Sequence, residues 1–112
     1  YHPASNATNV AFVAQRAMRV KAIIGRVQAA GTDGGAVTAT VYKAPSATAI
    51  ASGTALHSGT FNLKGTASTN QTLTLSTTAG VLDIAAGDTI GIILTGTLTT
   101  ATGGITVALT PR

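Results

Sequence analysis

Few residues of this 112-residue chain belong to the types that carry chemistry, and their spacing does not assemble a reactive group. His57 and Ser58 are adjacent, and a distant Asp would complete the residue content of a nucleophilic triad, but no strained glycine-flanked serine turn accompanies them. His2 and His57 cannot by themselves close a metal site, and the chain has no cysteine. The sequence therefore predicts no catalytic, cofactor-binding or metal-binding residue, and we expect a protein that is not an enzyme.

The three acidic residues Asp33, Asp83 and Asp88 could be imagined as ligands of a calcium ion, which needs ~6–8 oxygen atoms. They are widely separated in the sequence, and two of them stand in predicted turns, where Asp bonds locally to the backbone. The glycine-rich segment 31–35 lacks the Lys-Ser/Thr pair of a phosphate-binding loop. We expect turns at these positions rather than ion sites.

Charged residues make up only 9% of the chain, and the formal net charge is +4. A surface covered mainly by Thr, Ser, Ala and Gly is typical of a chain that works inside an assembly or on a large particle. Nucleic-acid binding would require a denser basic patch, so no nucleic-acid partner is expected. No apolar run approaches the ~20 residues that span a bilayer, so no membrane partner is expected either.

Four of the seven basic residues fall close together, at Arg16, Arg19, Lys21 and Arg26. If the segment is a strand, Arg19 and Lys21 project from one face and could, with Arg16, meet an acidic partner surface. The alternative is a solvated strand face, or edge charges that prevent aggregation. These four residues are candidate partner contacts.

Residues 1–15 are polar and rich in turn formers, except for a short apolar run that includes Val10 and Phe12. The run predicts a first strand, or an arm that adds a strand to a neighbouring subunit. The alternative is a frayed terminus or a linker. We therefore divide the chain into an N-terminal arm or linker over 1–15, with Val10 and Phe12 as candidate contacts, and a single β-sandwich domain over 16–112.

Apolar residues alternate with polar ones in short runs that are punctuated by Gly, Pro and Ser-Thr clusters, which is the pattern of β-strands. The Val and Ile content of 16–28 favours a strand over a helix. The alternation of apolar and polar residues shifts by one position after Ile24, which predicts a bulge near Gly25. Turns are predicted at 85–88 and at 102–104. The fold class is all-β: an antiparallel, jelly-roll-like β-sandwich of about seven to eight strands.

Four segments together resemble small jelly-roll domains of tailed-bacteriophage structural proteins, and most of all capsid decoration (cement) proteins: 19–24 (RVKAII), 31–44 (GTDGGAVTATVYKA), 49–56 (AIASGTAL) and 82–91 (LDIAAGDTIG). The resemblance implies a homo-oligomer, often a trimer, bound to the outer surface of the virion capsid. There it would bridge neighbouring subunits of the major capsid protein and stabilise the shell as a structural protein without a cofactor. No functional residue carries over, because that family has no fixed binding motif to place on these positions.

Two other functions stay open. The domain could be the tip of a head or tail fibre that recognises host-surface carbohydrate, although sugar sites usually present aromatic rings and aromatics are only 4% of this chain. It could also be a secreted bacterial surface-layer or adhesion module, which the absence of cysteine permits.

Overall fold

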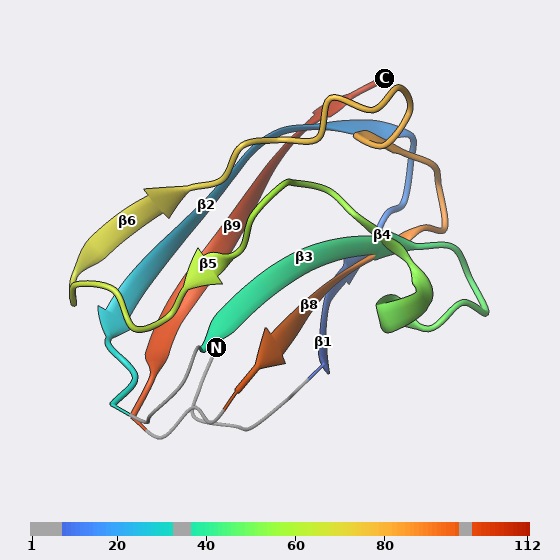
Figure 1. The fold of residues 1–112 in the computed structure, drawn as a ribbon. Coiled ribbons are helices and arrows are strands. Elements are labelled where there is room, and N and C mark those ends of the chain that lie inside the picture. The colour runs from blue at the N-terminus through green and yellow to red at the C-terminus, as the bar shows by residue number, and fades with distance from the viewer. Residues whose placement is uncertain (1–7, 33–36, 97–99) are drawn as a thin grey trace.

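Two antiparallel β-sheets pack against each other in the computed structural model, which describes residues 8–32, 37–96 and 100–112 (Figure 1). The predicted all-β class and the antiparallel β-sandwich are confirmed. The described residues form nine strands and one 3-10 turn: β1 (Thr8–Val13), β2 (Met18–Ala29), β3 (Thr38–Ala44), η1 (Ile50–Ser52), β4 (Thr54–Ala55), β5 (Phe61–Asn62), β6 (Thr69–Thr72), β7 (Asp83–Ile84), β8 (Thr89–Thr95) and β9 (Thr102–Pro111).

The first sheet has the order β1-β8-β3-β4, with β5 also paired to β3. The second sheet is built around β2. The short strands β6 and β7 pair with one edge of β2, while β9 pairs with β2 along nearly its whole length, from Met18 to Ala29. Figure 1 shows β9 running beside β2, with β6 along the same sheet. Both β1 and β9 have only one paired neighbour among the described strands.

Backbone hydrogen bonds join the two sheets along one side of the sandwich. The Leu56 amide donates to the Val41 carbonyl of β3 at 3.0 Å, and the Ser76 amide donates to the Leu56 carbonyl at 3.0 Å. From the same segment, the Leu73 amide donates to the Ile23 carbonyl of β2 at 3.1 Å. Because these bonds run from β3 to β2 past β4 and β6, the edges formed by β1 and β9 lie together on the opposite side.

The core between the sheets consists of inward-facing Val, Ile, Leu and Phe side chains, as the alternating pattern predicts. Phe61 is 1% exposed and lies against the Cα of Gly25, where an added Cβ would come 2.7 Å from the ring. On the outer face of the first sheet, the Ile50 side chain lies against Gly91 of β8, where an added Cβ would come 2.7 Å from the isoleucine. The two glycines in these strands therefore make room for buried side chains.

The structure corrects two local predictions. The bulge expected near Gly25 is wrong: the pairing of β2 with β9 shifts between Val20 and Ala22, so that Lys21 is the extra residue, and again between Val27 and Ala29. The turn predicted at 102–104 is also wrong, because these residues begin β9 and Thr102 pairs with Ala29. The glycines there suggested a turn, but pairing with the long β2 prevails over the local preference.

Residues 8–13 of the predicted arm form β1, which pairs with β8 at the edge of the first sheet. Residues 1–7 lie outside the described residues, as does Asp33. The turn at 85–88 is present: Gly87 has a φ of 90°, and the Asp88 carboxylate accepts the Ala85 amide at 3.0 Å. Asp88 thus has the local turn role that its neighbours in the sequence predict.

Candidate functional site

The four candidate basic residues do not form one patch. Arg16 is exposed in the crossover between β1 and β2, and Lys21 is exposed in the β2 bulge. Arg19 and Arg26 both lie on the outer face of the second sheet, but they are seven positions apart along β2, a distance of about 20 Å. Among the described residues, the side-chain contacts of Arg26 are long: 3.4 Å to Asn70 and 3.5 Å to Gln28.

Arg19 belongs to a charged cluster that is centred on Asp83 of β7. Its Nε atom donates to the Asp83 carboxylate at 2.7 Å, and an Arg112 guanidinium nitrogen lies 3.5 Å from the other carboxylate oxygen. Lys43 reaches over from β3 and donates to the backbone carbonyls of Asp83 at 2.7 Å and Gly80 at 3.0 Å. Two arginines thus contact the Asp83 carboxylate, and Lys43 adds a third positive charge nearby.

The cluster explains the direction of two pKa changes. The hydrogen bond from Arg19, together with the nearby positive charges, lowers the pKa of Asp83 below 3.8, although desolvation opposes the change. The same hydrogen bond and charge raise the pKa of Arg19. The cluster of basic residues in the sequence points to Arg19, but nothing in the sequence points to Lys43 or Arg112, because these isolated cations have no local pattern that relates them to Asp83.

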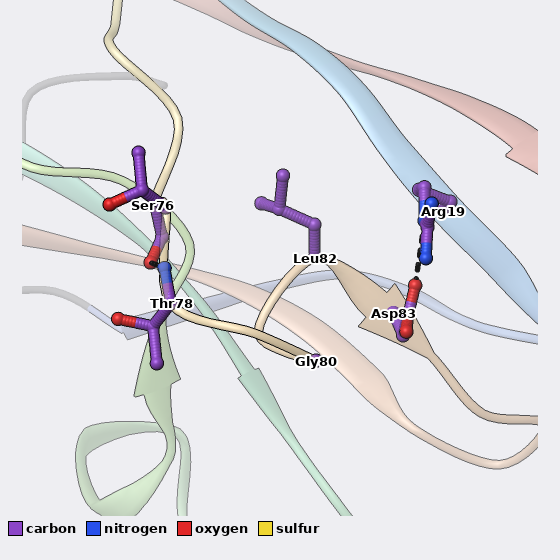
Figure 2. A pocket seen from close by; sticks show the side chains of 7 residues that line it. Arg19, Ser76, Thr78, Gly80, Leu82 and Asp83 are labelled. Carbon is purple, nitrogen blue, oxygen red and sulfur yellow. Dashed lines mark hydrogen bonds and ion pairs between the residues drawn. The ribbon is translucent and has the colours of Figure 1, made fainter.

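An open depression of about 210 Å³ lies beside this cluster. Figure 2 shows Arg19 and Asp83 on one side of it and Ser76 and Thr78 on the other, with Leu82 between them. The Ser76 hydroxyl accepts the Thr78 amide at 3.2 Å, so part of its hydrogen-bonding capacity is used within the loop. The lining offers hydroxyl, guanidinium and carboxylate groups, and it includes no aromatic ring.

His57 and Ser58 make hydrogen bonds to the backbone and not to each other's side chains. His57 is 6% exposed, its Nε2 atom accepts the Val41 amide at 2.9 Å, and its Nδ1 atom lies 3.3 Å from the Ser58 carbonyl. A neutral ring with its proton on Nδ1 satisfies both contacts. Burial lowers the pKa of His57, because desolvation disfavours the charged ring more than the nearby carbonyls favour it. Neither nitrogen faces the Ser58 hydroxyl, whose described contact is to the Thr74 carbonyl at 3.5 Å.

The candidate residues of the arm lie on the edge strand β1. Val10 is 64% exposed, and Phe12 is half-buried and packs against the core. Within the described ranges, no group of three or more His, Cys, Asp and Glu could hold a metal ion, and no helix is long and apolar enough to cross a membrane.

Comparison with known proteins returned no relative: no family model matches the chain, and neither a curated protein nor a solved structure matches it.

Proposed function

We propose that this chain is a non-enzymatic virion structural protein that binds the outer surface of a bacteriophage capsid. It bridges neighbouring subunits of the major capsid protein and so stabilises the shell, and it works as a homotrimer. The resemblance of four sequence segments to capsid decoration proteins suggests this function, and the surface of the sandwich supports it.

The observation that carries the proposal is the outer face of the second sheet. Along β2 this face presents Arg19 and Arg26 together with Ile24, which is 41% exposed, and the bulged Lys21 lies beside them. Ile24 is flanked in register by Thr72 of β6 and Thr106 of β9. A weakly basic strand face of this kind would complement an acidic partner surface, which we propose the shell supplies.

Charge reversal on this face tests the proposal by co-sedimentation with shells that lack the protein. Lys21 and Arg26 are chosen because neither takes part in the Asp83 ion pairs. Exposed ion pairs are worth ~0–1 kcal/mol each, so we expect Lys21→Glu with Arg26→Glu to weaken binding about tenfold. Lys64→Glu, on the loop after β5, reverses one charge away from this face and should bind as the parent does. Equal binding by all three proteins would contradict the role of this face.

The depression beside Asp83 supports a second candidate, a fibre-tip domain that recognises host-surface carbohydrate. Carboxylate, guanidinium and hydroxyl groups are suitable partners for sugar hydroxyls, and here they converge on one hollow. The lack of an aromatic ring in its lining weighs against this function. A glycan array with saturable binding that Ser76→Ala reduces would favour the fibre-tip function over shell binding.

A further inference from the structure

The described residues leave one side of the sandwich open between the edge strands β1 and β9. The two sheets are joined by hydrogen bonds on the opposite side, so β1 and β9 border the same gap. Apolar side chains that point between the sheets remain half-buried here, although they pack against the core: Phe12, Ile92, Ile105, Val107 and Leu109. The described residues thus leave the core incompletely covered along this side.

The edge of β9 directs backbone groups toward solvent. In an antiparallel pair, residues alternate between exchanging both hydrogen bonds and exchanging none. Ile23 gives its carbonyl to Leu73 on the β6 side, so its β9 partner Val107 exchanges none with β2. Ile105 is two residues from Val107 and by the same alternation also exchanges no hydrogen bonds with β2. Leu109 exchanges none either, because its partner Val20 donates its amide to the Leu82 carbonyl on the other side of β2. These three residues therefore point their N–H and C=O groups away from β2.

Natural sheets usually protect such an edge with charged residues, prolines, bulges or a very short strand. β9 is ten residues long and has no charged residue, and its one proline, Pro111, is the last residue of the strand. Both register shifts in its pairing place the extra residue on β2 and leave β9 continuous. β1 likewise has no charged residue, and it exposes Val10 and Val13. Among the described residues, β1 therefore has no charge or proline, and the 105–109 part of β9 has none of these protective features, which indicates a surface that is covered in the working protein.

We propose that the open side is the contact between copies of this chain, with β9 of one subunit pairing with β1 of the next. A strand of ten residues is about 33 Å long. The width of the open side is about 20 Å, from a sheet separation of about 10 Å and one strand spacing of about 5 Å at each edge. The open side therefore has an area of roughly 660 Å². Stable interfaces bury about 800 Å² per partner, so the open side has a suitable size. An uncharged edge favours an uncharged partner strand, since a charged one would lose its hydration without compensation, and β1 is such a strand.

The pairing joins two different edges, so it is heterologous, and a ring closes when the rotation between subunits divides a full turn. Because β1 and β9 lie on the same side of each subunit, the open sides of all subunits face the ring axis. This deepens the proposed homotrimer by naming its contact surface. It can be tested without a capsid, so its failure is distinguishable from failure of shell binding.

The first test compares the same substitution on the two faces of the second sheet. Ile105→Lys places a charge in the open side, where the lysine reaches water in a single subunit but is buried in an assembly. Ile24→Lys adds the same charge on the outer face, one register position away. Light scattering coupled to size exclusion should give a trimer for the parent and for Ile24→Lys, and monomer for a folded Ile105→Lys. A monomeric parent at all concentrations, or a trimeric Ile105→Lys, would overturn the proposal.

The second test keeps the proposal testable if Ile105→Lys does not fold. The chain has no cysteine, so Val10→Cys in β1 and Ala108→Cys in β9 each introduce a single thiol at an exposed position. A short bis-maleimide should link the two variants when they are mixed and should link neither variant to itself. Links within one variant alone, or no links at all, would refute the pairing of β9 with β1.

Discussion

Gly25→Ala tests the packing between the two sheets, because the added Cβ would lie 2.7 Å from Cε1 and 2.9 Å from Cδ1 of Phe61. Phe61 is 1% exposed and belongs to the core, so its ring has little room to move. Overpacking of a core costs about 1–3 kcal/mol. Replacing a strand glycine by alanine otherwise gains about 0.5–1 kcal/mol, so we expect a net loss of about 1 kcal/mol.

Gly104→Ala is the matched control, because Gly104 is paired with Arg26 in the same sheet and its added Cβ would meet nothing within 4 Å. We expect this variant to gain the same ~0.5–1 kcal/mol without a clash, so the two alanines should differ by about 2 kcal/mol. Thermal unfolding should place Gly25→Ala about 5 °C below the parent and Gly104→Ala above it.

A double-mutant cycle attributes the loss to the ring. In a Phe61→Leu background the smaller side chain leaves space, so Gly25→Ala should cost less there than in the parent. The reasoning is refuted if Gly25→Ala is as stable as Gly104→Ala, or if its cost is unchanged when Phe61 is replaced.

Three further predictions concern the buried His57 and the charged cluster around Asp83. Because the pKa of His57 is lowered in the folded state, the unfolded chain binds more protons below pH 6.5. The free energy of unfolding should therefore fall as the pH drops from 6.5 toward the folded-state pKa. His57→Gln should flatten this pH dependence when denaturation is measured over a pH series. The lowered pKa of Asp83 acts at lower pH: its stabilisation is present above pH 3.8 and is lost as the pH falls through the folded-state pKa. Asp83→Asn should abolish this loss of stability at acidic pH. High salt should weaken the part of the stabilisation that comes from the Arg19 ion pair. Lys43→Met removes two hydrogen bonds to the carbonyls of Gly80 and Asp83, which should cost about 1–3 kcal/mol of stability. Amide hydrogen exchange in β7 should become faster. Unchanged exchange would show that Lys43 does not hold this strand.

The fold class could be predicted because alternation of apolar and polar residues is a local property. β2 and β8 both show it clearly, and their inward-facing residues are buried as the pattern predicts. The bulge could not be placed, because its position depends on the partner strand: Lys21 becomes the extra residue only when Val20 lies opposite Leu109 and Ala22 opposite Ala108. Pairing between strands that are distant in the sequence leaves no mark in either strand alone.

The charged cluster shows the same limit. Arg19 and Asp83 are 64 residues apart, and they meet because β7 pairs with the start of β2. The open side could not be predicted either, since β9 resembles any half-buried strand until the sheet order shows that it pairs with one neighbour among the described strands. Local composition indicates which residues are strand, and the topology determines which edges remain open.

The most direct test of the proposed capsid role is to find whether a phage genome encodes this protein and to measure its copy number in purified virions of that phage. Quantitative mass spectrometry against the major capsid protein gives this ratio without any assumption about the contact surface. A shell decoration protein predicts a ratio near parity or a simple fraction of it. A few copies per particle would contradict the account and favour a fibre or tail, and complete absence from virions would refute a virion role.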